Sequence, residues 1–470
     1  MTTPFSVDRK RVVVVGAARS GVAAAELLVR RGAIVTLTDT RPQIDDAGRL
    51  RALGVSLALG GHEGARLASA HLIVLSPGVS PRQPEVAAAH AVGVPVIGEL
   101  ELASRWLRGK IVAITGTKGK STTTTLTGRM LDAAGYRVLV GGNIGLALSA
   151  QVDDSTDDTI HVVEASSFQL ETTDTFHPWI AVLLNFSPDH LDRHADEREY
   201  AEAKARLFAN QTADDWAVIN ADDPSVLAMA ARARSRRLAF SIHGAAEADV
   251  VIENSTIVRR GPNGAQALVP LSSIRLLGRH LVADVLAASA VASLCGVDAA
   301  AMTKAVEGFT GLEHALEPVA DVAGVRFVND SKATNIDAAL RAIESFDDGL
   351  VVILGGKFKG GSFAALGPAL TARRATVIAI GEATPLIEQA LAGSLAVHRA
   401  RDMADAVARA FALAQPGDTV LLAPACASFD MFRDYAERGR VFKEEVAKTA
   451  KITRSKDPTA KITGWKDRIQ

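Results

Sequence analysis

Short apolar runs alternate along the chain with longer stretches rich in alanine and leucine. Residues 11–15 (RVVVV) and 350–354 (LVVIL) are almost wholly apolar, a pattern typical of strands buried on both faces of a parallel sheet. Residues 20–31 and 281–294 have the length and composition of helices. Strands that alternate with helices in this way predict an α/β protein.

The spacing of these elements divides the chain into three domains and a tail. At roughly 150 residues per domain, a length of 470 residues also suggests three domains. We place a Rossmann-like domain at 1–98, a central domain at 99–309 and a second Rossmann-like domain at 310–448. The predicted strands are 11–15, 34–38 and 72–75, then 111–115, 160–164 and 180–184, then 325–328, 350–354, 376–380 and 419–422. Residues 449–470 are basic with weak apolar periodicity, so we expect a mobile tail.

The composition argues against nucleic acid or a membrane as a partner. The chain carries 52 basic and 53 acidic residues, so no strong net field attracts either one. The longest apolar runs have strand length, and residues 1–10 lack the apolar core of a signal peptide. Cys295 and Cys426 are the only cysteines, which excludes a disulfide framework and a cysteine zinc cluster. We therefore expect a cytoplasmic protein.

A glycine-rich turn at residues 116–122 (GTKGKST) lies between a predicted strand and a predicted helix. Gly116 and Gly119 let backbone N–H groups converge on phosphate oxygens, and the helix N-terminus adds a positive potential. Lys120 is expected to reach the β- and γ-phosphates, and Ser121 to offer its hydroxyl to Mg²⁺. Because the motif is shorter than the general phosphate loop, a plain turn with an exposed lysine is the alternative. The flanking strand and helix favour a phosphate loop in a central ATPase domain.

A second glycine turn, at residues 16–21 (GAARSG), follows the first predicted strand. It lacks the middle glycine of the dinucleotide fingerprint, which argues against a redox cofactor. Asp39 ends the next strand, where an acidic residue can bind a ribose or uridine. A plain strand-to-helix turn fits these residues equally well.

Polar residues gather where the central strands end. Glu164 closes one strand and is a candidate Mg²⁺ ligand. The segment 185–194 (NFSPDHLDRH) follows the next strand. Because so many polar groups are costly to bury without partners, we expect them to face a site. Lys204 lies on a predicted helix at 198–209, where a lone lysine is expected on the solvated face.

Three loops of the third domain also follow predicted strands. They are 329–335 (NDSKATN), 355–361 (GGKFKGG) and 424–429 (PACASF). Loops at the carboxyl ends of parallel strands share one edge of the sheet, so we expect these loops to converge on a ligand crevice. Cys426 is a conceivable nucleophile, but it lacks a recognisable histidine partner, and a small packed thiol is the preferred interpretation.

Together these motifs resemble those of the Mur ligase family, from about residue 10 to about residue 447. The motifs that carry the resemblance are GTKGKST at 116–122, EASSFQLE at 164–171, NFSPDHLDRH at 185–194, NDSKATN at 329–335 and ACASFD at 425–430. The last two are similar to the family member that adds D-glutamate. The resemblance implies an ATP-dependent amide ligase that joins D-glutamate to UDP-N-acetylmuramoyl-L-alanine through an acyl phosphate, in cytoplasmic peptidoglycan precursor synthesis. We expect a monomer.

The resemblance also implies roles for individual residues. The ATP-binding residues would be Gly116, Thr117, Lys118, Gly119, Lys120, Ser121, Thr122, Asp284, Asp330 and Lys332. The UDP-substrate would contact Arg19, Ser20, Asp39, Thr40, Arg41, Gly78 and Asn143, and D-glutamate would contact Thr334, Lys359, Ser428, Phe429 and Tyr435. Two Mg²⁺ ions would be held by Ser121, Glu164, His190 and a carbamylated Lys204, whose charge becomes negative. The catalytic set would be Lys120, Glu164, His190 and Lys204.

Three positions depart from the family pattern. Lys118 and Asp284 stand where the family usually has asparagine, and Ala315 stands where an arginine usually follows His314. Loss of that arginine removes a charged contact worth about 1.5–3 kcal/mol, unless Lys118 or Arg279 compensates. We therefore expect weaker ATP binding than is typical of the family, with the chemistry retained, and a nucleotide titration tests this.

Two alternative functions stay open at this point. A ligase like folylpolyglutamate synthetase shares the phosphate loop and central domain, but it does not need the uridine-type features at Asp39 and 76–78. Asp284 and Ala315 keep open a second alternative, a nucleotide-binding relative without catalytic activity. Phosphate release that requires both UDP-N-acetylmuramoyl-L-alanine and D-glutamate distinguishes the main hypothesis from both.

Overall fold

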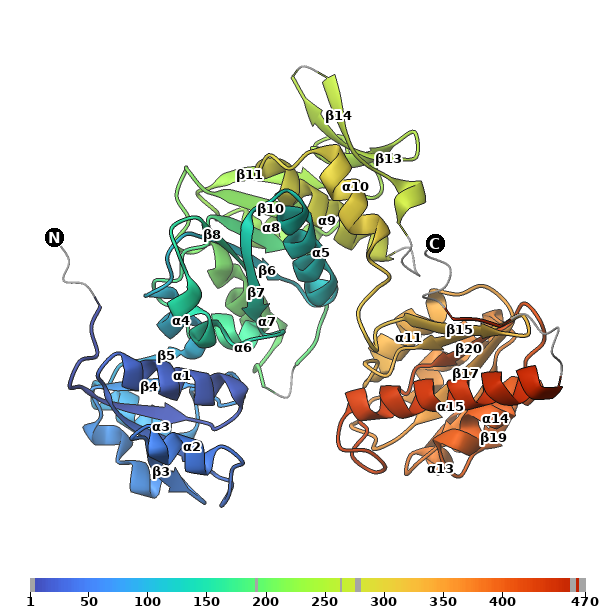
Figure 1. Cartoon of the computed structure of the whole chain (residues 1–470), viewed down its shortest axis with the longest axis horizontal. Coiled ribbons are helices and arrows are strands. Elements are labelled where there is room, and N and C mark those ends of the chain that lie inside the picture. Colours follow the sequence, from blue (N-terminus) through green and yellow to red (C-terminus); the bar gives the residue numbers. More distant parts are fainter. Residues whose placement is uncertain (1–4, 191–192, 263, 275–279, 457–461, 465–470) are drawn as a thin grey trace. The chain divides into compact units, whose positions relative to one another are not determined.

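The computed structural model of the chain describes residues 5–190, 193–262, 264–274, 280–456 and 462–464. The described residues form three β-sheets with helices packed around them (Figure 1). The N-terminal and central sheets belong to one compact unit, and the chain from residue 309 onward belongs to the second. None of the described helices is both long enough and apolar enough to cross a membrane.

The N-terminal sheet has five parallel strands in the order β3-β2-β1-β4-β5. Its elements are β1 (Arg11–Val15), α1 (Arg19–Arg30), β2 (Ile34–Asp39), α2 (Ala47–Ala52), β3 (Ser56–Leu59), β4 (Leu72–Leu75), α3 (Pro84–Ala91) and β5 (Val96–Gly98), followed by α4 (Glu99–Ser104). Because β1 and β4 are neighbours, the loops that follow them lie side by side, as at a topological switch point. Gly16 has a φ of 95°, and a Cβ there would lie only 2.8 Å from Val79 of the second loop.

The central sheet has nine strands in the order β14-β13-β12-β11-β10-β9-β6-β8-β7. Its strands are β6 (Lys110–Thr115), β7 (Arg137–Gly142), β8 (Thr159–Glu164), β9 (Ile180–Leu183), β10 (Trp216–Asn220), β11 (Arg236–Phe240), β12 (Val250–Glu253), β13 (Thr256–Gly261) and β14 (Gly264–Pro270). Its helices are α5 (Lys120–Ala133), α6 (Ser167–Leu170), α7 (Glu197–Ala205), α8 (Pro224–Ala230), α9 (His280–Leu294) and α10 (Ala299–Glu307). Since β6 lies between β8 and β9 and runs parallel to both, the polar segments that follow these three strands meet at one edge.

The C-terminal sheet has seven strands in the order β19-β18-β17-β20-β16-β15-β21. Its strands are β15 (Glu317–Val322), β16 (Val325–Asn329), β17 (Leu350–Gly355), β18 (Thr376–Ile380), β19 (Val397–Arg399), β20 (Thr419–Leu422) and β21 (Ile462–Gly464). Its helices are α11 (Ile336–Glu344), α12 (Gly367–Ala372), α13 (Thr384–Leu391), α14 (Met403–Leu413) and α15 (Tyr435–Lys456). The predicted strands at 376–380 and 419–422 are confirmed to the residue.

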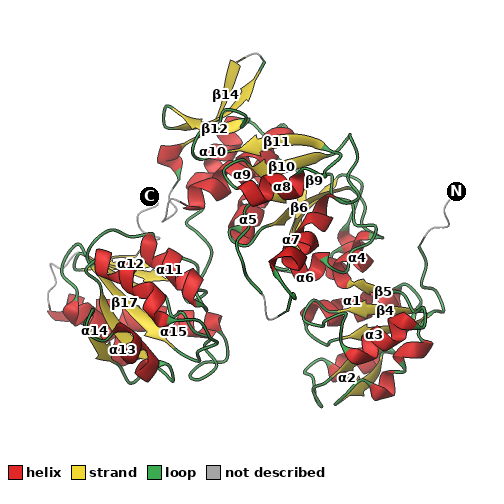
Figure 2. Ribbon diagram, turned by 180° about the vertical axis from the view of Figure 1, so that it is seen from behind, coloured by secondary structure: helices red, strands yellow, loops and turns green. Residues whose placement is uncertain are grey.

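Helices cover both faces of the C-terminal sheet, as the fully apolar strand β17 predicts (Figure 2). Val352 and Leu354 of β17 pack with residues of α11 to α13 on one face. Val351 and Ile353 of the same strand pack with residues of α14 and α15 on the other face. Alternate side chains of one strand therefore enter two cores, which is why the strand shows no polar positions.

The prediction of a mobile tail from residue 449 was wrong for the part of the tail that the structure describes. Helix α15 continues to Lys456, and β21 pairs with β15 in antiparallel register. Phe442 and Val446 are buried and Ala450 packs against the same cluster. Their spacing of four residues keeps one face of the helix on the core beyond the predicted boundary. The other tail residues lie outside the described part.

Candidate functional site

The phosphate loop joins β6 to α5 at the carboxyl edge of the central sheet. Gly119 forms the cap of α5 with a φ of 81°, which an L side chain rarely adopts. The Lys120 ammonium donates hydrogen bonds to the carbonyl oxygens of Gly116 and Thr117, each at 3.0 Å. Lys120 therefore lies over its own loop, where a phosphate group would be held.

Asn185, directly after β9, holds the phosphate loop in shape. Its Oδ1 accepts hydrogen bonds from the backbone N–H groups of Thr117 (3.1 Å) and Lys118 (2.9 Å). Its Nδ2 donates to the Lys118 carbonyl oxygen at 3.1 Å. The predicted site set omitted Asn185, although its position at the end of a strand next to β6 was the available signal.

Glu164 is a buried carboxylate beside the phosphate loop. It is only 1% exposed, and its Oε1 accepts a hydrogen bond from Asn143 Nδ2 at 2.7 Å. Its Oε2 has no hydrogen-bond partner among the described residues. An ionised oxygen that is buried without a partner is costly, whereas carboxylate and hydroxyl oxygens are the ligands that Mg²⁺ prefers. The unpartnered oxygen of Glu164, at the same edge of the sheet as the phosphate loop that carries Ser121, therefore fits a Mg²⁺ ion.

Lys204 is buried, so the expectation of a solvated lysine on α7 was wrong. Its side chain is 1% exposed, and its Nζ donates to the Gly116 carbonyl oxygen at 2.7 Å. Burial, reinforced by the nearby charge of Lys120, holds the pKa of Lys204 well below its usual range. The Nζ also lies 4.5 Å from the centre of the Tyr200 ring. Burial thus favours the neutral form of the Lys204 amine, which is the form that can act as a nucleophile.

His190 stands on a loop that is tied to the phosphate loop. Its φ of 58° is unusual for a residue other than glycine. Its backbone N–H donates to Asp189 Oδ1 at 2.9 Å, and Asp189 forms an ion pair with Lys118 at 3.6 Å. The His190 ring packs edge-on against Phe168, with ring centres 4.9 Å apart. The structure thus connects the His190 loop to the phosphate loop through Lys118, one of the departures from the family pattern.

Asp284 on α9 presses against the phosphate loop. A Cβ added to Gly119 would lie 2.1 Å from Asp284 Oδ1, so only glycine fits there. Asp284 is buried, and its Oδ2 has no hydrogen-bond partner among the described residues. Burial raises the pKa of Asp284 well above its usual value. A carboxyl group that keeps its proton is neutral and has the shape of asparagine, which explains physically why aspartate is tolerated here.

Replacing Asp284 by asparagine is expected to stabilise the fold at neutral pH. The unfolded chain ionises this carboxyl above its ordinary pKa of 3.8 while the folded chain keeps the proton. The stability of the wild type therefore falls as pH rises, by at most about 1.4 kcal/mol per pH unit for this group. Thermal unfolding from pH 4 to 8 should show that D284N is more stable than the wild type, by a margin that grows with pH. An advantage that is independent of pH would contradict the proposed protonation.

The N-terminal sheet carries a cavity of about 400 Å³ at its carboxyl edge. It is lined by Gly16, Asp39, Thr40, His62, Gly78, Val79, Ser80, Arg82 and Gln83. Three of the residues predicted to contact the UDP-substrate, Asp39, Thr40 and Gly78, therefore share one cavity.

Asp39 organises the loops at this cavity. Its carboxylate accepts hydrogen bonds from the backbone N–H of Ala17 at 2.7 Å and from the Arg41 guanidinium at 2.9 Å. The bond from Arg41 is the main reason that the pKa of Asp39 lies well below its usual range. The remaining predicted contacts are more scattered: Arg19 reaches the Gly145 carbonyl oxygen at 3.4 Å. Asn143 binds Glu164 instead of lining this cavity.

In the second unit, the loops after β16, β17 and β20 lie together as predicted, because β20 pairs with both other strands. The Ala425 N–H donates to the Ala333 carbonyl oxygen, and the Lys357 N–H donates to the Ala427 carbonyl oxygen, each at 2.9 Å. The predicted D-glutamate residues Lys359, Phe429 and Tyr435 are exposed on or beside these loops, Thr334 is half-buried and Ser428 is buried. Cys426 is fully buried in the core, and burial raises its pKa to about 12, which confirms a packed thiol.

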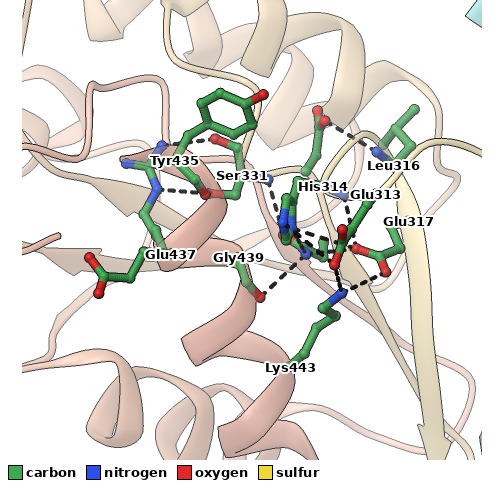
Figure 3. A network of polar contacts seen from close by, with 12 residues as sticks. Glu313, His314, Leu316, Glu317, Ser331, Tyr435, Glu437, Gly439 and Lys443 are labelled. Atoms are coloured by element: carbon green, nitrogen blue, oxygen red, sulfur yellow. Dashed lines mark hydrogen bonds and ion pairs between the residues drawn. The ribbon is translucent and has the colours of Figure 1, made fainter. Parts of the chain in front are cut away.

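A polar network joins α15 to the strand ends of this sheet (Figure 3). Asn329 Nδ2 contacts His314 Nδ1 and Glu317 Oε2, each at 2.9 Å. Lys443 forms ion pairs with Glu313 at 2.6 Å and with Glu317 at 3.0 Å. Two carboxylates therefore neutralise Lys443. Of the two residues named as possible replacements for the arginine that is missing after His314, Lys118 pairs with Asp189 and Arg279 lies outside the described residues. Weak ATP binding stays a prediction.

The nucleotide contacts predicted in this unit lie at the same strand ends. Asp330 Oδ1 accepts a hydrogen bond from the Leu316 N–H at 3.1 Å, and the Lys332 N–H donates to the His314 carbonyl oxygen at 3.0 Å. The buried Arg438 donates to Ser331 Oγ at 2.9 Å and to the Cys426 carbonyl oxygen at 3.0 Å. Arg438 thereby connects two of the three loops.

Comparison with protein families covers most of the chain. Residues 10–98 match the Mur ligase MurD-like N-terminal domain, residues 114–292 the Mur ligase middle domain, and residues 316–426 the Mur ligase glutamate ligase domain. The UDP-N-acetylmuramoylalanine–D-glutamate ligase of Acidobacterium capsulatum is 48% identical, over 93% of this chain and 96% of that protein. The chain belongs to the Mur ligase family. Proteins of the same name from Solibacter usitatus (46% identity) and Koribacter versatilis (44%) align over 93% and 95% of this Mur ligase, and over 97% and 99% of their own lengths.

Solved structures confirm the Mur ligase fold. MurF ligase from Thermotoga maritima in complex with ADP has a TM-score of 0.60 at 17% identity, over 94% of this chain and 96% of that chain. The pseudomurein peptide ligase type C of Methanothermus fervidus has a TM-score of 0.58 at 17% identity, over 94% and 100%. At this level of identity the likeness concerns the three-domain α/β architecture, which agrees with the predicted fold class.

Proposed function

We propose that this Mur ligase is an ATP-dependent ligase that forms an amide between UDP-N-acetylmuramoyl-L-alanine and D-glutamate, in cytoplasmic peptidoglycan precursor synthesis. The observation that carries the proposal is the near-full-length identity of 44–48% with three proteins of that named activity. The central site supports it independently, because a phosphate loop stands beside the buried Glu164, whose Oε2 has no hydrogen-bond partner among the described residues. A ligase like folylpolyglutamate synthetase does not account for the match of residues 10–98 to a MurD-like N-terminal domain.

Different residues of the chain bind ATP and neutralise charge during phosphoryl transfer. We assign ATP to residues 116–122 with Asp284, and also to Asp330 and Lys332. Lys120 neutralises the phosphoryl group as it passes to the L-alanyl carboxylate, which forms an acyl phosphate and ADP. Ser121 and Glu164 would hold one Mg²⁺ ion, and His190 and Lys204 would hold a second; when bound, these ions would add positive charge beside the phosphates.

We further propose that Lys204 acts as a carbamate. Its unprotonated amine can add to CO₂, which forms an N–C bond and releases a proton. The product is an anion that replaces a neutral group beside Lys120. Among the described residues, Lys204 donates a hydrogen bond only to the Gly116 carbonyl oxygen, which leaves the burial of its amine largely uncompensated. A carbamate on Lys204 would give the buried side chain a role, because its oxygen could serve as a Mg²⁺ ligand.

The second half-reaction uses the amine of D-glutamate. We assign this substrate to Thr334, Lys359, Ser428, Phe429 and Tyr435, and the UDP-substrate to Arg19, Ser20, Asp39, Thr40, Arg41, Gly78 and Asn143. The amine attacks the acyl phosphate, a tetrahedral intermediate forms, and it collapses to the amide with release of phosphate. Arg41 and the cavity-lining Asp39 form a preorganised pair. The exposed Lys359, Phe429 and Tyr435 suit an acidic amino acid. We assign the activity to a monomer.

Release of phosphate from ATP tests the proposed activity. The wild type should release phosphate only when UDP-N-acetylmuramoyl-L-alanine and D-glutamate are both present. L-alanine, L-lysine and diaminopimelate should not replace D-glutamate. Release with a folate substrate and glutamate would favour the other ligase type, and no release at saturating ATP would favour a relative without catalytic activity.

A further inference from the structure

Arg193 connects the central domain to the N-terminal cavity. Its guanidinium donates hydrogen bonds to the carbonyl oxygens of Gly78 (3.3 Å) and Val79 (3.0 Å), two residues that line the cavity. The same group forms an ion pair with Glu171. The Arg193 side chain is only 14% exposed, so it is held on the N-terminal domain rather than extended into solvent.

A second arginine makes the reciprocal connection. Arg82 lines the same cavity and forms an ion pair with Glu199 on α7 of the central domain. Arg82, Glu171, Arg193 and Glu199 therefore make up an interdomain clasp, with one arginine from each domain. Glu171, Glu199 and the buried His194 also have the spacing of a metal site. Because each of the two carboxylates already pairs with an arginine, the clasp accounts for the group without a metal.

On its central side, the clasp is connected to the phosphoryl-transfer site through edge-on contacts between rings. The Arg193 guanidinium lies 4.7 Å from the centre of the Phe168 ring, and Phe168 packs against the proposed Mg²⁺ ligand His190. Tyr200, next to Glu199 on α7, packs against His190 at 6.1 Å and lies beneath Lys204. Both halves of the clasp therefore reach the groups that are assigned to the second Mg²⁺ ion.

We propose that Arg193 is a positioning residue that couples occupancy of the N-terminal cavity to the placement of His190. The proposal rests on the proposed function, since it takes the UDP-substrate as the cavity's ligand. A ligand that contacts Gly78 fixes the Gly78–Val79 backbone, whose carbonyl oxygens hold Arg193. Arg193 in turn fixes Phe168 and the His190 loop. Binding of the UDP-substrate thereby prepares the site for Mg²⁺ and the ATP phosphates.

The coupling is measured as the affinity for a non-hydrolysable ATP analogue with Mg²⁺, with and without saturating UDP-N-acetylmuramoyl-L-alanine. In the wild type the UDP-substrate should tighten nucleotide binding by at least about five-fold. In Arg193→Gln the coupling factor should fall to about one, while nucleotide affinity without UDP-substrate stays within about two-fold. The kcat of this variant should drop by about 100-fold, because the reacting groups are misplaced.

Three further variants separate positioning from general damage. Arg193→Lys should restore little of the coupling or of kcat relative to Arg193→Gln, because an ammonium group cannot reproduce the planar contacts of a guanidinium. Arg82→Gln removes the ion pair with Glu199, at a more exposed position of the clasp, and should also reduce the coupling. This variant replaces Arg193→Gln in the test if Arg193→Gln does not fold. Arg198→Gln, on an arginine of α7 that is 84% exposed and pairs with Glu202, is the control and should behave as the wild type.

The outcomes distinguish this inference from the proposed function. Wild-type coupling in a folded Arg193→Gln, or in a folded Arg82→Gln if the first variant does not fold, overturns the inference alone. A wild type that is active with D-glutamate but shows no coupling also overturns the inference alone. A wild type that does not bind the UDP-substrate contradicts both the proposed function and the clasp's role.

Discussion

Replacing Lys204 by methionine should reduce D-glutamate-dependent phosphate release by about 10³-fold or more, the scale expected for loss of a key electrostatic group. The fold should be at least as stable as before. The unfolded chain protonates Lys204 at neutral pH, whereas the folded chain holds the amine with a pKa well below 10.5. The folded wild type therefore carries a burial cost at pH 7 that methionine avoids, and that cost shrinks as pH rises toward 10.5.

The comparison needs the variant, the wild type and Lys304→Met, a substitution of an exposed lysine on α10. Phosphate release and thermal unfolding are measured on all three, with and without bicarbonate. Bicarbonate should raise the activity of the wild type and leave Lys204→Met unchanged. An active Lys204→Met would contradict the role of the amine, and an inactive variant that has lost stability would point to a structural role instead.

Replacing Glu164 by glutamine should lower kcat by about 10²–10³-fold, the range for removal of one charge-stabilising group. Half-maximal activity should also require more Mg²⁺, because an amide oxygen is a weaker ligand than a carboxylate. Stability should change little, since the glutamine carbonyl can still accept the hydrogen bond from Asn143. Removal of the charge also lowers the cost of burial.

Steady-state kinetics over a range of Mg²⁺ concentrations checks this expectation. Glu202→Gln is the matched control, because it makes the same chemical change on an exposed side chain of α7. A Glu164→Gln variant with unchanged Mg²⁺ dependence would show that the unpartnered carboxylate oxygen is not a metal ligand.

The sequence predicted best where local pattern and tertiary environment agree. The strands at 11–15, 376–380 and 419–422 match to the residue, because runs that are apolar after a polar first residue suit a buried strand. The three loops of the C-terminal sheet could be placed on one edge because parallel strands share a direction. The end of α15 was missed because its apolar face recurs only every fourth residue among many charges.

The site was less predictable because burial and pairing are tertiary properties. Lys204 looks like any surface lysine in a charged helix, and only the fold shows that the Gly116 carbonyl oxygen is its partner. Asn185 was visible as a polar residue after a strand, but its hydrogen bonds to the phosphate loop depend on β9 lying beside β6. Arg193 could not be assigned to the N-terminal cavity, because the chain separates it from Gly78 by 115 residues.

The central claim is that this chain forms an amide between a UDP-linked carboxylate and D-glutamate at the expense of ATP. The most direct measurement follows ¹⁵N-labelled D-glutamate incubated with UDP-N-acetylmuramoyl-L-alanine, ATP and Mg²⁺. The label should appear as an amide nitrogen in the UDP-linked product, with one phosphate released for each label incorporated. Label that stays as a free amine while the wild-type protein is folded and supplied with all three substrates would contradict the claim.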